Sequence, residues 1–344
     1  MNMKKLRVLV LMHADLIPPE EVKDADLSTV EWRTEYDVVS TIRELGHEVL
    51  VVGVRDDPLV IRQAVDDWHP QIAFNLLEEF SGVALYDQNV VSYLELLGVP
   101  YTGCNPRGLM LARDKALAKK ILHYHHIPIP EFITVPVGRP VRRPKDLAFP
   151  LIVKSVSEEA SLGISQASIV EDDAKLQERV AFIHQGVGTG ALVERYVEGR
   201  ELYVGVLGHR RLQVLPVWEL DLSRMPADAR RIATERVKWS RKYRDKYDIT
   251  SGQAKGLPNG VEEKVRDLAR RVYQVLGLSG YARIDLRLDP LGQVYVLEAN
   301  PNPEIARRED FAASAEQAEL PYPALLQRIL ELGLRWRPDT LAEA

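Results

Sequence analysis

The sequence predicts an α/β protein in which a parallel N-terminal sheet precedes lobes of mixed α+β structure. Three observations lead to this prediction. Over the first hundred residues, apolar runs typical of strands alternate with amphipathic stretches typical of helices. The length of 344 residues suggests two or three domains. Toward the C-terminus, residues 281–288 and 293–299 predict two strands joined by a turn.

The N-terminal unit is expected to hold three strands and three helices. Strands are predicted at residues 6–11, 48–53 and 72–75, and helices at 34–45, 58–67 and 86–97. Such alternation indicates a parallel sheet covered on both faces. Ligands of these sheets bind beyond the carboxyl ends of the strands, here near His13–Asp15 and Asn75–Glu79.

The rest of the chain predicts two further units. The first has helices at 114–126 and 172–184, with strands at 149–154 and 163–169. The second has strands at 191–197, 201–207 and 212–220 and helices at 261–276 and 323–332, the last of which should pack back near the C-terminus. Residues 222–256 are polar and irregular, and a loop of that length is usually functional or disordered. We therefore expect boundaries at 103/104 and 190/191.

The strand pair near the C-terminus carries most of the charged chemistry. Residues 281–288 alternate, so that Arg283, Asp285 and Arg287 share one face. A four-residue connection would define which residues of the two strands lie opposite each other. The expected pairs are Asp285 with Glu298, Arg283 with Asn300, and Asp289 with Val294.

Directly opposed carboxylates on neighbouring strands repel each other. A hard divalent cation removes this conflict, and Mg²⁺ typically shares such carboxylates with nucleotide phosphates. The alternative is a purely structural cluster of arginines and carboxylates on a half-buried sheet. The acidic pair with Asn300 on the same face favours a Mg²⁺–nucleotide site.

Composition excludes several other classes. A net charge of −5 argues against a surface that binds nucleic acid or an anionic membrane. The single cysteine, Cys104, excludes an intramolecular disulfide framework and a multi-cysteine zinc site. We find no apolar core of signal-peptide length and no segment approaching the ~18 apolar residues of a membrane span. A cytoplasmic protein is expected.

Standard phosphate-binding fingerprints are missing, since there is neither a G-x-x-x-x-G-K-[ST] loop nor a G-x-G-x-x-G after a strand. The glycines at 186, 188 and 190 predict a helix-to-strand turn. The histidines at 123, 125 and 126 suit either a metal or a helix C-terminus. Lys115 opens a helix and Lys154 ends an apolar strand, where a point charge suits phosphate. Residues 155–163 form a small, polar loop able to cover phosphate.

Taken in order, these segments resemble the ATP-grasp superfamily and, within it, the D-alanine–D-alanine ligase family. The resemblance covers about two thirds of the chain; the N-terminal unit is similar in layout only. It implies an N-terminal pre-ATP-grasp domain (1–103), a central lobe (104–190) and a C-terminal lobe carrying the metal site (191–344). The matching segments are Leu97–Gly103, Arg113–Lys115, Val153–Lys154, Leu192–Tyr196, Gly199–Leu202, Leu215–Pro216, Val237–Trp239, Ala282–Asp285, Glu298–Asn300 and Leu320–Pro323.

The resemblance implies roles for individual residues. The implied ATP contacts are Lys115 and Lys154 for phosphates or adenine, the backbone of Glu194, Arg195, Tyr196 and Val197 for the adenine edge, Glu201 for the ribose, and Lys238 for the terminal phosphate. The implied reacting centre is Asp285, Glu298 and Asn300 holding two Mg²⁺ (or Mn²⁺) ions, with Arg283 neutralising charge and Ser161 in the phosphate-covering loop.

The chemistry implied is ADP-forming ligation of a carboxylate to an amine through an acylphosphate, with small amino-acid or peptide substrates. The loops at 155–163 and 236–246 would close over the intermediate. A homodimer through the N-terminal unit is the usual arrangement of the family. Two alternatives stay open from the sequence. One is a kinase of the same fold that phosphorylates a small molecule without ligation, and the other is a nucleotide-binding protein without catalysis.

The departures from the family all lie on the amino-acid side. The Gly-Ser-Ser element of the covering loop is replaced by Glu159-Ala160-Ser161. The N-terminal Gly-Gly-x-Ser-x-Glu segment is replaced by residues 12–19, with Glu31 or Glu35 as substitutes for the carboxylate that binds the substrate ammonium. After Asn300, residues 302–310 replace the elements that receive the second carboxylate, and Arg307 or Arg308 is the candidate for a different carboxylate. The sequence therefore predicts a different substrate.

Overall fold

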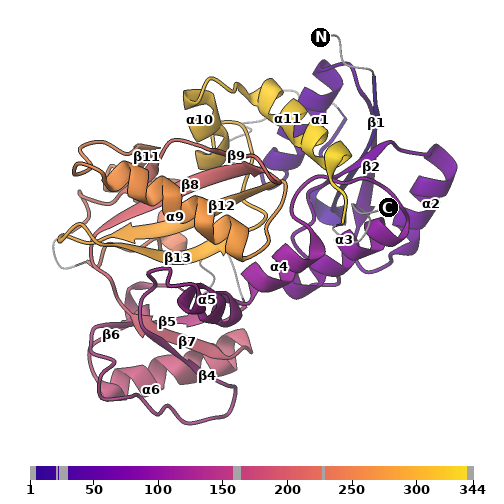
Figure 1. The fold of residues 1–344 in the computed structure, drawn as a ribbon. Coiled ribbons are helices and arrows are strands. Elements are labelled where there is room, and N and C mark those ends of the chain that lie inside the picture. Colours follow the sequence, from indigo (N-terminus) through magenta and orange to yellow (C-terminus); the bar gives the residue numbers. More distant parts are fainter. Residues whose placement is uncertain (1–4, 21, 23–29, 158–163, 227–228, 339–344) are drawn as a thin grey trace.

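The computed structural model describes residues 5–20, 22, 30–157, 164–226 and 229–338 (Figure 1). Its strands form three sheets, one parallel and two antiparallel. No helix within these residues is long and apolar enough to cross a membrane. The mixed α/β class expected from the sequence is confirmed.

The first sheet is the predicted parallel one, with strand order β2-β1-β3. Its strands are β1 (Arg7–His13), β2 (Glu48–Val54) and β3 (Ile72–Asn75). The helices of this unit are α1 (Arg33–Glu44), α2 (Leu59–Trp68) and α3 (Asp87–Leu96), with short 3₁₀ turns η1 (Ala14–Leu16) and η2 (Ala84–Tyr86). The central strand β1 is buried from Val8 to Met12, because helices cover both faces of the sheet.

The last helix, α11 (Tyr322–Arg335), lies against this N-terminal sheet. It contacts α1 and β3, and its Leu326 and Ile329 share a buried cluster with Val8 and Phe74 (Figure 1). The helix expected over residues 323–332 is confirmed, but its contacts with the N-terminal unit were not predicted. Its apolar face is filled by the distant N-terminal unit.

The second sheet has four strands in the order β4-β7-β5-β6. They are β4 (Phe132–Val135), β5 (Leu151–Ser155), β6 (Ile169–Val170) and β7 (Ala191–Arg195). Helices α5 (Lys115–Tyr124) and α6 (Asp173–Phe182) and the π-helical turn η4 (Ile183–Val187) belong to this part of the chain, and α4 (Pro106–Arg113) contacts α3 and α5. Since β7 pairs with both β4 and β5, a boundary at 190/191 would divide this sheet. The division into three units stays a prediction, and we propose that the second boundary follows β7.

The strand predicted over residues 163–169 is wrong for residues 164–168 and right for Ile169. Gln166–Ser168 form the 3₁₀ turn η3, and β6 begins only at Ile169. The Ser168 hydroxyl accepts a hydrogen bond from the backbone N–H of Ser165 at 3.0 Å. Serine side chains that bond locally to the backbone in this way compete with the hydrogen bonds of a sheet.

The third sheet is antiparallel, with order β11-β10-β8-β12-β13 and β9 paired to β8. Its strands are β8 (Arg200–Gly208), β9 (Leu212–Val214), β10 (Trp218–Asp221), β11 (Thr250–Gln253), β12 (Tyr281–Leu288) and β13 (Val294–Asn300). Helix α9 (Val261–Val275) packs on β8, β12 and β13. The single strand expected over 212–220 is divided in two around Pro216, which has no N–H to donate to a sheet.

The segment 222–256, expected to be irregular, contains three short elements. They are α7 (Glu235–Trp239), α8 (Arg241–Lys246) and the strand β11. A further helix, α10 (Asp310–Gln317), was also not predicted. These elements are short, so periodicity gives little signal for them.

The strand pair β12–β13 has the predicted register at its charged end. Asp285 lies opposite Glu298, and Arg283 lies opposite Asn300. The expected pairing of Asp289 with Val294 is wrong, because Leu288 occupies that position. The register shifts by one residue between Asp285 and Leu286, which is a β-bulge that leaves Leu297 without a direct partner. The turn is correspondingly tighter, since Asp289 N–H donates to the Gln293 carbonyl at 2.9 Å.

Candidate active site

The opposed carboxylates of Asp285 and Glu298, in the third sheet, lie near lysines of α5 and of the second sheet. Lys115 is the first residue of α5, whose N-cap Asp114 accepts a hydrogen bond from Leu117 N–H at 2.9 Å. The buried Lys115 ammonium lies 3.5 Å from Glu298 Oε2. Lys115, predicted at a helix start, and Glu298, predicted on a strand, are therefore close together in the structure.

Lys154, predicted to end a strand, is the last residue but one of β5 and forms an ion pair with Glu194 of β7. The other oxygen of the Glu194 carboxylate lies 2.9 Å from the ammonium of Lys119. All three side chains are at least nine-tenths buried. Burial by itself would raise the pKa of Glu194, but Lys119 and Lys154 outweigh it and hold this pKa below its usual range.

Lys119 was not predicted to belong to the site. It lies four residues after Lys115 on α5, so both project from one helix face. The four-residue spacing from Lys115 is the feature of the sequence from which Lys119 could have been predicted. Burial lowers the pKa of Lys119, with the charge of Glu194 opposing this. We call Lys115, Lys119, Lys154, Glu194 and Glu298 the lysine cluster.

The carboxylate of Asp285 is held by its neighbour on the same strand face. Arg283 donates Nε to Oδ1 at 2.7 Å and Nη2 to Oδ2 at 2.9 Å, and its guanidinium lies 4.7 Å from the centre of the Tyr203 ring. Burial raises the pKa of Asp285, and the charge of Glu298 adds to this. Burial would also raise the pKa of Glu298, but Lys115, Lys154, Lys238 and Arg283 lower it to about 2.

The oxygen donors needed for a hard cation are present on this face. Asp285 and Glu298 are paired directly across the strands, and Asn300 follows on β13 with its Oδ1 accepting from Asn302 N–H at 2.9 Å. Within the described residues no group of three His, Cys, Asp or Glu side chains is able to hold a metal. Two carboxylates and one amide suit a metal whose remaining ligands are phosphate oxygens.

Lys238 approaches both carboxylates from helix α7. The N-cap Thr234 of this helix accepts from Val237 N–H at 3.3 Å, and Glu235 N–H donates to the Ile164 carbonyl at 3.2 Å. The positive charge of Lys238 lowers the pKa of Glu298. The segment around α7 therefore touches the end of the covering loop. Residues 158–163 with Ser161 lie outside the described residues.

The segment expected to pair with the adenine edge is partly engaged within the second sheet. Arg195 N–H donates to Glu131 O at 2.9 Å, and Tyr196 N–H donates to Pro150 O at 3.0 Å. The N–H groups of Arg195 and Tyr196 are therefore not available to adenine in this arrangement.

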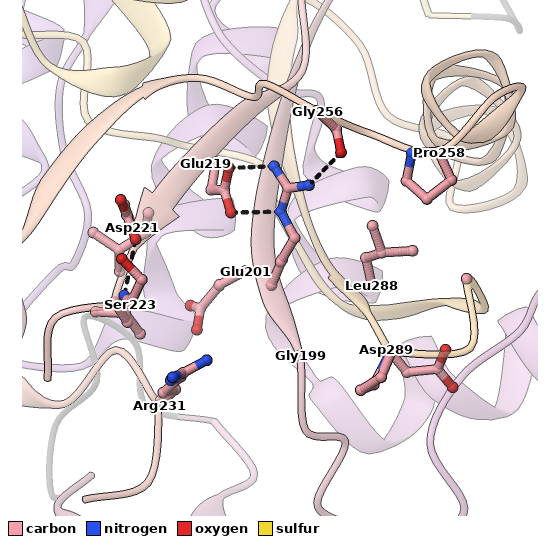
Figure 2. A pocket seen from close by; sticks show the side chains of 15 residues that line it. Gly199, Glu201, Glu219, Asp221, Ser223, Arg231, Gly256, Pro258, Leu288 and Asp289 are labelled. Carbon is pink, nitrogen blue, oxygen red and sulfur yellow. Dashed lines mark hydrogen bonds and ion pairs between the residues drawn. The ribbon is translucent and has the colours of Figure 1, made fainter. Parts of the chain in front are cut away.

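Glu201, the predicted ribose ligand, is buried at the start of β8. Its carboxylate accepts from Tyr203 Oη at 3.0 Å and from Arg287 Nη2 at 2.8 Å. It also lines a pocket of about 340 Å³ together with Glu219 and Arg231, where the Arg200 guanidinium is bound by Glu219 (Figure 2). A carboxylate oxygen accepts more than one hydrogen bond, so Glu201 retains capacity toward this space.

The four residues proposed for the substrate occupy different environments. Glu31 is exposed just before α1, whereas Glu35 is buried in its first turn. Arg307 donates to Thr41 Oγ1 at 2.9 Å and lies 4.8 Å from the Tyr322 ring centre. Arg308 has a positive φ of 74° in the loop after β13. Of the two glutamates, the structure brings Glu35 close to that loop.

Comparisons with known proteins agree with this arrangement. A family profile described as "D-ala D-ala ligase C-terminus" matches residues 121–331. The chain is 32% identical over 308 residues to the uncharacterized protein y4sG of Sinorhizobium fredii, covering 87% of this chain and 86% of that one. It is 31% identical over 314 residues to the D-alanine–D-alanine ligase of Desulforudis audaxviator, covering 88% and 94%.

Among solved structures, the fold is similar to that of the Bacillus anthracis D-alanine–D-alanine ligase complexed with ATP. The TM-score is 0.73 at 24% identity, with 96% of this chain and 98% of the other covered. At that identity the likeness concerns the fold.

Proposed function

The chain belongs to the D-alanine–D-alanine ligase family of ATP-grasp enzymes, and from this premise we propose which residues act and how the substrates differ. As a member it is an ATP-dependent ligase that forms a C–N bond. We propose that it joins two amino-acid-like substrates that are not both alanine. ATP-dependent ligation is supported above all by the cationic side chains around Glu298. They are Lys115, Lys154, Lys238 and Arg283.

We assign the ATP contacts to the lysine cluster. Lys115 and Lys154 would hold the phosphates, and Lys238 would reach the terminal phosphate from α7. Glu194, pinned by two ammonium groups, presents the strand whose carbonyls at Arg195 and Tyr196 and backbone at Val197 would meet adenine. Glu201 would bind the ribose hydroxyls. The excess of positive charge in this region suits a triphosphate.

We propose that Asp285, Glu298 and Asn300 hold the Mg²⁺ that accompanies ATP. When bound, the metal neutralises charge on the phosphates. Glu298 is a strong candidate because its pKa of about 2 keeps it ionised. Arg283 lies two residues before Asp285 on the same face of β12, and it would neutralise the transferred phosphoryl group.

The proposed reaction has two steps. An oxygen of the substrate carboxylate attacks the γ-phosphorus, and the bond to the departing ADP oxygen breaks, giving an acylphosphate. The amine of the second substrate then attacks the acyl carbon, the C–O bond to phosphate breaks, and the amine loses a proton. Catalysis rests on positioning and charge neutralisation, which suits a site of lysines and arginine. Closure of the loops at 155–163 and 236–246 would exclude water.

The test is a phosphate-release screen of amino-acid and amine pairs in the presence of ATP and Mg²⁺, with mass spectrometry of the products. Release that depends on both substrates, together with an amide product, supports the proposal. A stable phosphorylated product without an amide would identify a kinase instead. ATP binding without phosphate release from any pair would contradict both. The cytoplasmic location and the homodimer remain predictions.

A further inference from the structure

Arg287 holds three residues of the pocket wall around Glu201 without lining the pocket itself. It is buried near the end of β12, directly opposite Glu201 on β8. Its Nη2 donates to Glu201 Oε2 at 2.8 Å. Its Nη1 donates to the carbonyls of Gly199 at 3.2 Å and Arg231 at 2.8 Å. Gly199, Glu201 and Arg231 all line the pocket (Figure 2), so Arg287 supports its shape from outside.

The carboxylate of Glu201 is held at both of its oxygens. Oε1 accepts a hydrogen bond from Tyr203 Oη at 3.0 Å, and Oε2 accepts the one from Arg287. The side chains of Arg287 and Glu201 are exposed by only 5% and 8%. Within the part of the chain that the structure describes, no other cation forms an ion pair with Glu201. Because a buried carboxylate is costly without a cation, Arg287 both compensates this charge and fixes its orientation.

The guanidinium of Arg287 is itself fixed by the segment that contains Arg231. The side chain of Gln166 donates to the Arg230 carbonyl at 2.9 Å and accepts from the Arg230 N–H at 2.8 Å. On the other side of Arg231, Ile232 is 2% exposed and belongs to a buried apolar cluster. The Arg231 carbonyl is therefore held in place from both sides. Since the donors of a guanidinium form a rigid planar fork, this carbonyl also sets the direction of Nη2.

A second ion pair beside the same pocket shows what is particular about Glu201. Arg200 donates Nε and Nη2 to the two oxygens of Glu219, at 2.7 and 2.6 Å. One guanidinium thus takes both oxygens of Glu219. Arg287 takes only one oxygen of Glu201, and each oxygen of this carboxylate is left with a further lone pair. A carboxylate in this state suits two neighbouring hydroxyl donors.

We propose that Arg287 is a positioning residue for ribose selection, which holds Glu201 so that its carboxylate accepts hydrogen bonds from the two ribose hydroxyls of ATP. This inference rests on the proposed role of Glu201 in ATP binding. Arg287 acts through Glu201 rather than on the nucleotide. Its removal should therefore abolish the preference for a nucleotide with ribose hydroxyls, while the lysine cluster still binds the phosphates.

The experiment compares the dissociation constants of ATP and 2′,3′-dideoxyATP by calorimetry in the presence of Mg²⁺. The ratio of the two constants is the hydroxyl preference. We expect the wild type to bind ATP at least about tenfold more tightly than the dideoxy nucleotide. In Arg287→Met the hydroxyl preference should fall to about twofold or less, because Glu201 loses its cation and its fixed orientation.

Three further variants separate positioning from a general loss of structure. Glu201→Gln should lose the same preference, and adding Arg287→Met to it should cause no further loss, because the two residues act as one unit. Arg287→Lys keeps the charge without the fork, so its preference should be intermediate and at least about threefold below that of the wild type. Arg266→Met is the matched control. Arg266 is on α9, outside the pocket, and donates to the Val214 carbonyl at 2.9 Å.

Thermal unfolding verifies that each variant is folded, and Arg287→Lys decides the matter if Arg287→Met does not fold. A merely structural role of Arg287 would weaken the binding of both nucleotides equally. An unchanged hydroxyl preference in the folded Arg287 variants would therefore overturn the inference. A wild type that binds both nucleotides equally would overturn it as well, and so would an equal loss of preference in Arg266→Met.

Failure of this inference is distinct from failure of the proposed function. Amide formation by Arg287→Lys with the hydroxyl preference of the wild type would overturn the inference and leave the ligase function intact. A preference that depends on Arg287, without phosphate release from any substrate pair, would contradict the ligase function and leave the positioning role intact.

Discussion

Two groups of charged side chains, the lysine cluster and an acidic cluster made of Glu35, Asp37, Glu304 and Glu309, have opposite imbalances of charge. In the lysine cluster, Glu194 and Glu298 each have an ammonium within 3.5 Å, and lysines are in excess. In the acidic cluster, carboxylates are in excess, and three buried polar atoms in or near it have no hydrogen-bond partner among the described residues. They are Glu35 Oε2, Tyr281 Oη and Tyr322 Oη. The difference shows that only the lysine cluster is suited to an anion such as phosphate, because a further negative charge beside the acidic cluster would be repelled. Four variants test this comparison.

The largest expected effect is that of Glu298→Gln. This change removes the carboxylate that faces Asp285 and three lysines, so the turnover number for phosphate release should fall by about 10³-fold, or roughly 4 kcal/mol of transition-state stabilisation. ATP binding, measured by calorimetry, should weaken less. Glu262→Gln on the exposed face of α9 is the control. A turnover number within tenfold of the wild-type value would show that Glu298 is not required for the reaction.

The next effect is on folding rather than turnover. Lys119→Met leaves Glu194 paired only with Lys154, and the free energy of unfolding should fall by about 3 kcal/mol, because a buried carboxylate loses a partner. Lys120→Met, the exposed neighbour on the same helix, should change it by less than about 0.5 kcal/mol. Chemical denaturation measures both. Equal stability of the two variants would show that Lys119 does not compensate Glu194.

Glu35→Gln should raise the free energy of unfolding, by an amount that depends on pH. The folded-state pKa of Glu35 is raised from 4.5 to about 7, so its ionisation destabilises the fold progressively as pH rises between these values. Without substrate, the variant should gain up to about 3 kcal/mol over the wild type at pH 8 and little at pH 4. Unfolding curves across this range provide the measurement. A gain that does not grow with pH would contradict the burial of an uncompensated carboxylate.

The smallest effect compares two buried tyrosines. Tyr281 Oη has no partner among the described residues, whereas Tyr273 Oη donates to the Gly208 carbonyl at 2.7 Å. Tyr281→Phe should therefore leave the free energy of unfolding unchanged or raise it by up to about 1 kcal/mol, while Tyr273→Phe should lower it by about 1 kcal/mol. If both variants lose stability equally, the Tyr281 hydroxyl has a hydrogen-bond partner in solution.

Local rules were enough for the charged strand pair. Alternation along β12 and a short turn predicted that Asp285 faces Glu298 and that Arg283 faces Asn300, and both pairs are present. The same reasoning failed beyond Asp285, because a bulge at Leu297 depends on how β13 fits its neighbours and not on its own pattern. Lys115 and Lys154 were predicted as well, since a helix start and a strand end are features of the local sequence.

Contacts between distant segments were beyond those rules. Lys119 appears in the sequence as one more polar residue of an amphipathic helix; it becomes part of the site only because α5 packs beside β7, where Glu194 is buried. Likewise, α11 completes the N-terminal sheet, and residues 33–37 meet residues 304–309. The sequence by itself determined the periodicity of each strand and helix and the side chains on each face. Only the tertiary structure decided which faces meet, because packing is the sum of contacts between residues far apart in the chain.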